Sequence, residues 1–374
     1  MKKISTALCI REIEDLFRPY ADRKLSLVSR FVMAPLSRRL APDGVPTPEM
    51  SVYYRRRAER GVGLIITESA AIDDVSAADD SCMPRFYGGD ALRQWKRICR
   101  AVHATDCKIM PQLCHVGMAR PVDGDVPHPE ALPIGPSGID VYSLEKQGVP
   151  MMRQRISEVC ASFARAALAA QALGFDGVEI QGGHGYLIDQ FLWKETNRRN
   201  DVYGGDIVGR TRFACEVVHA VRKAVGRRFP IIFRFSQWKE GYPGACLVNS
   251  AHELSEMLQP LCDAGVDIFD CAELHYAQPA FVGNPLTLAA WTRLLTGKPV
   301  ISGGSVGMPQ DSQFPADKGE RVLLNLVRKL RSGELDLVAV GRALLADAEW
   351  VEKIHHARDE EIIPYSRRSA SRLF

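Results

Sequence analysis

The chain has 374 residues, of which 46% are hydrophobic and 25% charged, so it can bury a large core and its composition is not that of a disordered protein. The net charge of +3 and the lack of a long basic block argue against nucleic-acid binding, and no apolar window is long enough to span a membrane. The ten cysteines form no CxxC pair and no tight cluster with histidine, which argues against a metal site and is typical of free thiols in a reducing cytoplasm.

Eight short apolar runs recur along the chain, each bounded by Gly, Pro or polar residues. Runs of this kind are typical of strands that are buried on both faces of a parallel sheet. We expect strands at residues 31–36, 63–67, 108–113, 177–180, 230–236, 268–271, 299–302 and 337–340.

Amphipathic stretches of helical length separate these runs, and we expect helices at residues 48–60, 92–104, 156–173, 210–225, 251–264 and 319–330. Strands that alternate with helices eight times predict an α/β fold, a single (β/α)8 TIM barrel. We expect one domain over residues 1–374, with a Pro- and Gly-rich insertion over one rim at 120–152 and a C-terminal tail at 357–374. The arginine run Arg55, Arg56 and Arg57 is expected on a solvated helix face.

Polar residues follow the ends of the predicted strands, where the active sites of barrels gather. Gly303 and Gly304 follow the seventh strand, and Gly341 and Arg342 follow the eighth. Glycine lets backbone N–H groups approach an anion, and a guanidinium can clamp phosphate oxygens. These two turns predict a phosphate site, with ordinary strand-to-helix turns as the alternative.

Two further residues suit the pyrimidine edge of a flavin. Arg234 lies within an apolar strand, so it requires an anionic partner, which is either a reduced flavin or a structural ion pair. Gln112 ends the third strand, and its amide can donate and accept as that edge does, although it could also cap the strand. His115 follows closely and is expected in the same cluster.

A glycine-rich turn follows the fourth strand, which ends at Gln181. The turn is expected to present His184 and Tyr186 over the barrel mouth, unless they are merely a packed loop histidine and a tyrosine at the edge of the core. Hydrogen-bond donors held together can grip a carbonyl oxygen, and a tyrosine beside them can deliver a proton to carbon.

At these residues the sequence resembles the Old Yellow Enzyme family of FMN-dependent NAD(P)H oxidoreductases, over about residues 16–354. Several ordered segments carry the resemblance: FVMAPLS at 31–37, YYRRRA at 53–58 leading into GVGLIITE at 61–68, QLCHVG at 112–117, GFDGVEIQGGHGYLIDQFL at 174–192 and NRRNDVYGG at 197–205. Any one segment is a weak signal, whereas the whole set in this order is a strong one.

The resemblance implies a role for each matching position. The implied flavin contacts are Pro35, Leu36, Ser37, Ser69, Gln112 and Arg234, and the implied phosphate contacts are Gly304 and Arg342, with Gly303 and Gly341 beside them. Tyr186 matches the proton donor. The family's substrate-gripping pair is usually His-x-x-His or His-x-x-Asn, whereas here Gln181 replaces the first histidine and His184 stands second. This departure changes the donor geometry, so the site could be retuned for another acceptor or donor.

The resemblance implies that bound FMN takes hydride from NAD(P)H and reduces an activated alkene such as an α,β-unsaturated carbonyl. Gln181 motivates an alternative, an FMN-dependent amine or N-methyl dehydrogenase or a specialised biosynthetic oxidoreductase. A third hypothesis is a flavin-free lyase or aldolase, although the strand ends carry no lysine. A fourth, left open by Gln181, is a non-catalytic flavin-binding or interaction protein. We expect a cytoplasmic enzyme with a small-molecule substrate, no metal, no nucleic-acid or membrane partner, and direct reduction by NAD(P)H. Dimers and larger assemblies are common in that family, which leaves a homo-oligomer open.

Overall fold

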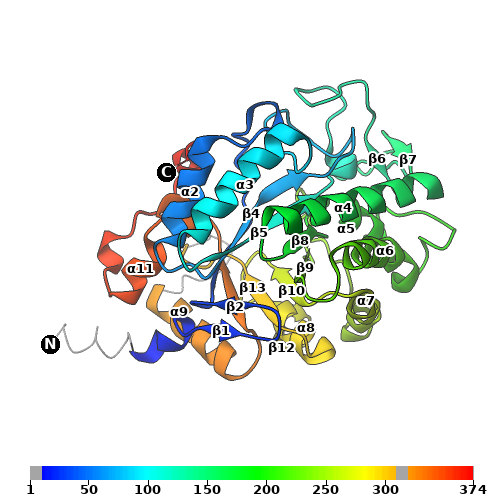
Figure 1. Ribbon diagram of the computed structural model, residues 1–374. Coiled ribbons are helices and arrows are strands. Elements are labelled where there is room, and N and C mark those ends of the chain that lie inside the picture. Colours follow the sequence, from blue (N-terminus) through cyan, green and yellow to red (C-terminus); the bar gives the residue numbers. More distant parts are fainter. Residues whose placement is uncertain (1–10, 309–318, 374) are drawn as a thin grey trace.

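Eight parallel strands close into a barrel in the computed structural model, which describes residues 11–308 and 319–373 (Figure 1). The barrel strands are β3 (Phe31–Met33), β4 (Leu64–Ala71), β5 (Lys108–Cys114), β8 (Val178–Gln181), β9 (Ile231–Phe235), β10 (Ile268–Ala272), β13 (Val300–Gly303) and β14 (Leu337–Val340). They pair in the order β10-β13-β14-β3-β4-β5-β8-β9, and each overlaps one of the eight predicted runs. The predicted (β/α)8 barrel is therefore confirmed.

Helices surround the strands in Figure 1. The longer ones are α2 (Pro48–Ala58), α3 (Gly89–His103), α4 (Arg153–Leu173), α6 (Ile207–Val225), α7 (Ala251–Ala264), α8 (Leu288–Thr296) and α9 (Gly319–Arg331). All but α8 overlap a predicted helix. The sequence did not reveal α8 because its 9 residues are too few to display a clear 3.6-residue period. Among the described helices, none combines the length and the apolar character that crossing a membrane requires.

Short helices and two-stranded pairs lie outside the barrel strands. The short helices are α5 (Leu187–Leu192), α10 (Arg342–Ala346), α11 (Trp350–His355), α12 (Arg367–Ala370), η1 (Glu14–Leu16), η2 (Pro42–Gly44), η3 (Gly117–Ala119) and η4 (Asp359–Glu361). Three two-stranded pairs complete the fold: β1 (Tyr20–Ala21) with β2 (Ser26–Leu27), β6 (Ile134–Gly135) with β7 (Val149–Pro150), and β11 (Pro279–Phe281) with β12 (Asn284–Thr287).

The barrel lumen has an apolar layer, which the β1–β2 hairpin joins. The residues of this layer are Tyr20, Leu25, Leu27, Val32, Ala34, Leu64, Ile66, Met110, Ile232, Ile268, Ile301, Leu337 and Ala339. Side chains two apart on a strand share a face, so Arg234 follows Ile232 into the lumen and Asp270 follows Ile268. The carboxyl ends of these strands thus bring polar groups to the lumen above a dry layer.

The expectation of a fully solvated arginine run is wrong for Arg57. Its side chain is fully buried, and the guanidinium carbon lies 3.7 Å from the centroid of the Tyr53 ring. It donates hydrogen bonds to the carbonyl oxygens of Tyr53 (2.7 Å) and Leu344 (3.0 Å). Arg57 therefore joins α2 to α10, whereas Arg55 and Arg56 are exposed as expected.

Two segments outside the barrel pack onto its rim. Within residues 120–152, the Tyr142 carbonyl accepts a hydrogen bond of 2.6 Å from the hydroxyl of Tyr242, in the loop that follows β9. In the C-terminal segment, the carbonyls of Ser369 and Arg372 accept from Arg38, which follows β3 and is buried. Both segments are thereby tied to loops at the carboxyl ends of the strands.

Candidate active site

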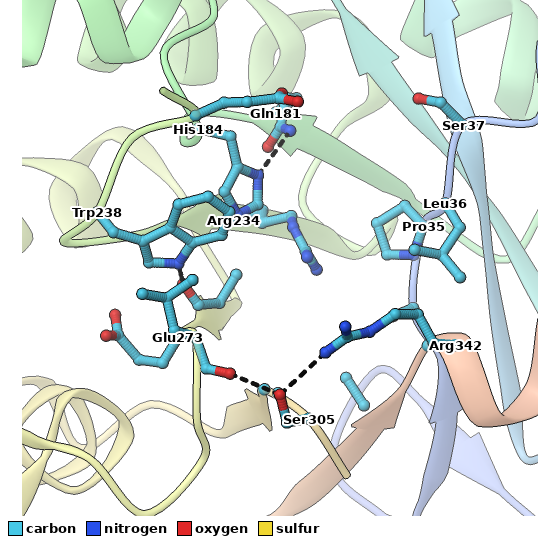
Figure 2. Close-up of a pocket in the computed structure, with 18 of the residues that line it drawn as sticks. Pro35, Leu36, Ser37, Gln181, His184, Arg234, Trp238, Glu273, Ser305 and Arg342 are labelled. Carbon is cyan, nitrogen blue, oxygen red and sulfur yellow. Dashed lines mark hydrogen bonds between the residues drawn. The ribbon is translucent and has the colours of Figure 1, made fainter. Parts of the chain in front are cut away.

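A cavity of about 520 Å³ opens among the carboxyl ends of the barrel strands. The residues expected to contact the flavin ring, its phosphate or the substrate all line it: Pro35, Leu36, Ser37, Ser69, Gln112, Gln181, His184, Tyr186, Arg234, Gly303, Gly304, Gly341 and Arg342. Figure 2 shows Pro35, Leu36 and Ser37 along one side, facing His184 and Trp238 on the other, with Arg234 between them. Residues from strands far apart in sequence therefore share one space.

One end of the cavity brings a glycine turn and an arginine together. Gly304 has a φ of +143°, and a Cβ added there would lie 2.5 Å from the Glu273 carbonyl oxygen, so only glycine fits. Next to it, the Ser305 hydroxyl donates to the Leu274 carbonyl (2.9 Å) and accepts from Arg342 Nη2 (3.0 Å; Figure 2). The uncovered backbone at Gly304 and the guanidinium of Arg342 therefore lie close together, and both supply the N–H donors that bind phosphate oxygens.

The segment after β3 forms a mostly apolar wall. The strand ends at Met33, although the Ala34 N–H still donates to the Val340 carbonyl. Pro35 has no N–H to continue the ladder, so the chain leaves the sheet and places Leu36 and Ser37 along the cavity. Such a wall suits the face of a planar ring, with the Ser37 hydroxyl at its edge.

The middle of the cavity has a hydrogen-bonded polar base. Ser69 donates to Gln112 Oε1, and Gln112 Nε2 donates to Glu179 Oε1 at 2.8 Å. Arg234 forms a buried ion pair with Asp270, so the structural ion pair considered from the sequence is present. Arg234 lines the cavity as well, and its Nε has no hydrogen-bond partner among the described residues. The ion pair and a ligand contact are therefore compatible.

The turn after β8 is fixed by close packing. A Cβ at Gly182 would lie 2.4 Å from Cζ of Phe233, so the turn packs directly against β9. His184 adopts a φ of +62°, and its N–H donates to the Ser236 hydroxyl at 3.2 Å. Its ring centroid lies 4.6 Å from that of Trp238. The histidine is thus held in one orientation at the cavity wall.

A buried ion pair supports the same turn from below. Lys239 Nζ lies 3.0 Å from Asp189 Oδ1, and the two side chains are 1% and 0% exposed. Asp189 Oδ2 also accepts from the Gly185 N–H at 2.6 Å, so the pair holds the backbone between His184 and Tyr186. Both functional side chains depend on this anchor for their positions.

Burial sets the protonation of the two side chains on the turn. Burial, with the positive charges of Arg234 and Lys239, lowers the pKa of His184 well below its usual value, so the imidazole is neutral. Burial and the nearby Cys114 and acidic groups raise the pKa of Tyr186 well above its usual value, so the phenol keeps its proton. A neutral imidazole and a protonated phenol can both donate hydrogen bonds.

The structure also contradicts one expectation and adds residues that the sequence did not suggest. The His115 side chain is buried with its Nε2 3.4 Å from Asp74 Oδ1, so it contacts a loop and does not line the cavity.

The cavity is also lined by residues that the sequence did not suggest, among them Trp238, Glu240, Glu273 and Ser305. They too follow strand ends, which was the one available signal, but their residue types matched no expected role. No group of metal-binding side chains occurs within residues 11–308 and 319–373.

Comparisons with known proteins agree with this geometry. Residues 15–361 match the model of the NADH:flavin oxidoreductase / NADH oxidase family. The chain is 32% identical to the NADH oxidase of Thermoanaerobacter brockii over 348 residues, which cover 90% of this chain and only 50% of that protein. It is 30% identical to 12-oxophytodienoate reductase 7 of Oryza sativa subsp. japonica, over 90% of this chain and 87% of that one.

A solved structure shows the same fold. The Old Yellow Enzyme from Pichia sp. AKU4542 superposes with a TM-score of 0.79 and 22% sequence identity, covering 96% of this chain and 91% of the other.

Proposed function

The chain belongs to the NADH:flavin oxidoreductase / NADH oxidase family, and from this premise we propose that it reduces an electron-poor C=C bond, such as that of an α,β-unsaturated carbonyl. It is an FMN-dependent oxidoreductase of the Old Yellow Enzyme family, with NAD(P)H as the hydride donor. A flavin-free lyase or aldolase is therefore excluded. The chain spans about half the length of the NADH oxidase that it matches, so the activity of the whole protein is part of the proposal.

The residues at the cavity fit FMN. The Gly304 turn and Arg342 would hold the phosphate, because bare backbone N–H groups and a guanidinium meet there. The wall at Pro35 and Leu36 would lie along the ring, and Gln112 and Arg234 would meet its pyrimidine edge. The unpartnered Arg234 Nε supports this placement, since a buried donor without a partner is costly.

When bound, FMN supplies the hydride that passes to the acceptor. His184 and Gln181 would hold the acceptor's carbonyl oxygen, and Tyr186 would give its proton to the α carbon. The observation that carries the proposal is the turn after β8, which puts a neutral His184 and a protonated Tyr186 on the wall of one cavity.

Anaerobic half-reactions test this assignment. The purified protein should be yellow, and NADH or NADPH should bleach its flavin band without a further protein. Adding 2-cyclohexen-1-one should then restore the band. In Tyr186→Phe, bleaching should proceed normally and reoxidation should slow by about 100-fold or more, the usual contribution of a general acid. Tyr142→Phe is the matched control, because Tyr142 lies outside the cavity lining and is half exposed. Equal reoxidation rates in the three proteins would refute the role of Tyr186.

A second candidate is the dehydrogenation of an amine, and Gln181 favours it. Its side chain is only 4% exposed, and Nε2 lies 3.3 Å from His184 Nδ1. Gln181 lines the cavity, and its Oε1 is a buried acceptor without a hydrogen-bond partner in the described part of the chain. An acceptor there suits an N–H group better than a carbonyl oxygen, and the carboxyl groups of Glu240 and Glu273 line the same space.

The two candidate functions differ in whether the substrate reacts with the oxidised or the reduced protein. An amine substrate should bleach the oxidised protein without any nicotinamide, whereas an enone should act only on the reduced protein. Screening secondary and tertiary amines in the first assay and enones in the second therefore separates the two functions.

A further inference from the structure

Two carboxyl groups and one guanidinium lie together inside the barrel. Glu179 on β8 pairs with Gln112 on β5 in the strand register, and Asp270 on β10 pairs with Arg234 on β9. The side chains of Glu179 and Asp270 are 0% exposed, and Arg234 is 9% exposed. An apolar layer lies beneath them, and because neither carboxyl group is exposed, water screens their charges poorly.

Each of the two carboxyl groups uses only one of its oxygens in the hydrogen bonds and ion pairs of the described residues. One oxygen of Asp270 pairs with Arg234, and one oxygen of Glu179 accepts from Gln112 Nε2 at 2.8 Å. The other oxygens, Glu179 Oε2 and Asp270 Oδ1, have no hydrogen-bond partner among residues 11–308 and 319–373. Two buried acceptors on interacting carboxyl groups are satisfied together if one of the two groups carries a proton.

The charge balance requires the same proton. With both carboxyl groups ionised, the cluster would have a net charge of −1 in a dry lumen, whereas with one proton it is neutral. Arg234 pairs directly with Asp270, so the proton is assigned to Glu179. Glu179 interacts with Gln112 and Arg234 on the two flanking strands, β5 and β9, and with Asp270 on β10.

We propose that Glu179 is protonated in the working enzyme, donates to Asp270, and acts as the positioning residue that fixes Gln112 and Arg234 for the flavin. Burial and the negative charge of Asp270 also raise the pKa of Glu179 well above its usual value. The inference rests on the proposed placement of the ring against Gln112 and Arg234.

The arrangement around Glu179 has two consequences at the cavity. Glu179 Oε1 and the Ser69 hydroxyl bind opposite ends of the Gln112 amide, so the amide cannot turn over, and the groups that it presents to the ring are fixed. The neutral cluster also adds no negative charge below the ring, so a loss of the proton at high pH should weaken FMN binding.

Glu179→Gln tests the proposal, because glutamine imitates the protonated acid: its amide donates to Asp270 and its carbonyl still accepts from Gln112. Glu145→Gln is the matched control, since Glu145 is exposed in the segment at 120–152. Thermal unfolding of the FMN-free proteins and FMN affinity, read from the quenching of flavin fluorescence, are both followed from pH 6 to pH 9.5.

At pH 6, Glu179→Gln should match the wild type within a factor of about two in FMN affinity. As the pH rises, the wild type should lose stability relative to the variant, because a folded-state pKa above the unfolded value costs stability above the unfolded value. Its FMN affinity should fall by up to about tenfold for each pH unit above the folded pKa, while that of the variant stays flat. Glu145→Gln should follow the wild type.

Parallel pH profiles for the wild type and Glu179→Gln would overturn the proposal, as would weak FMN binding by the variant at pH 6. If Glu179→Gln fails to fold, the infrared C=O band of a protonated carboxylic acid is compared between the wild type and Glu179→Asp, because burial raises the pKa of Glu68 and Glu273 to about 7 as well. A band at pH 7 that changes in Glu179→Asp supports the proton, and its absence from the wild type refutes it. If the wild type does not bind FMN at all, the proposed flavin site fails, while the unfolding profiles still report on the proton.

Discussion

The Lys239–Asp189 ion pair should decide whether the turn after β8 holds its shape. Lys239→Met fills a similar volume and removes the charge that faces Asp189 at 3.0 Å. It also removes the donor to the carbonyls of Ser236 and Gln237, both at 3.1 Å. Breaking one side of a fully buried pair costs about 3–5 kcal/mol, since the remaining charge is left in a dry site. For a chain of this length that lowers the unfolding temperature by about 4–6 °C.

The loss should depend on pH in a defined direction. Burial raises the pKa of Asp189 even with Lys239 beside it, and without that cation the pKa should rise further. A carboxyl group whose folded-state pKa is raised contributes its stability at low pH and loses it as the pH passes through the folded value. The deficit of Lys239→Met should therefore be smallest near pH 5 and largest above neutral pH.

Differential scanning calorimetry of the wild type, Lys239→Met, Asp189→Asn and the double variant measures the loss of stability and its dependence on pH. The double variant should be more stable than Lys239→Met, because it leaves no unpaired carboxylate. Alkene reduction should fall in Lys239→Met by more than FMN affinity does, since the pair supports the turn with His184 and Tyr186. An unfolding temperature within 1–2 °C of the wild type at pH 8, or additive effects in the double variant, would show that the pair does not anchor the turn.

Three further changes have definite expected outcomes. Gly304→Ala forces a residue with a φ of +143° against the Glu273 carbonyl, so FMN affinity should fall at least about tenfold in fluorescence titrations, and an unchanged affinity would refute the phosphate cradle. Arg57→Met should lower the free energy of unfolding by about 2–3 kcal/mol in urea titrations, whereas exposed Arg55→Met should change it by less than about 0.5 kcal/mol. Gln181→His restores the family's usual donor and should raise the alkene-reduction rate about tenfold or more if the enone is the substrate class, and no gain would favour the amine candidate.

The barrel was predictable because its strands carry an unambiguous signal. A strand buried on both faces must be apolar over its whole length, and glycine or proline marks where it ends. The same rule located the cavity residues, because the carboxyl ends of parallel strands in a closed barrel all meet on one rim. The prediction of Gly303, Gly304 and Arg342 at one point therefore required only the strand boundaries, and not the packing of any side chain.

Arg57, which was expected on a solvated helix face, shows which contacts a local sequence pattern cannot predict. Arg57 and its exposed neighbour Arg56 are adjacent and chemically identical, and only the position of α10 makes one of them buried. The carbonyl of Leu344 that accepts its hydrogen bond lies 287 residues further along the chain. No local pattern encodes that contact, so a charged run on a helix reads as solvated until the tertiary structure is known.

The charged layer of the lumen shows a subtler limit. From the sequence, a flavin edge and a structural ion pair were considered as mutually exclusive partners for Arg234. The barrel register places Asp270 beside Arg234, and Glu179 interacts with both, while Arg234 still reaches the cavity. A cation that already has a full carboxylate partner offers a ligand less positive charge than a free one, so the strength of the site depends on the protonation of a third residue. That dependence is a property of strand pairing, and it can be seen only when the strands are brought together.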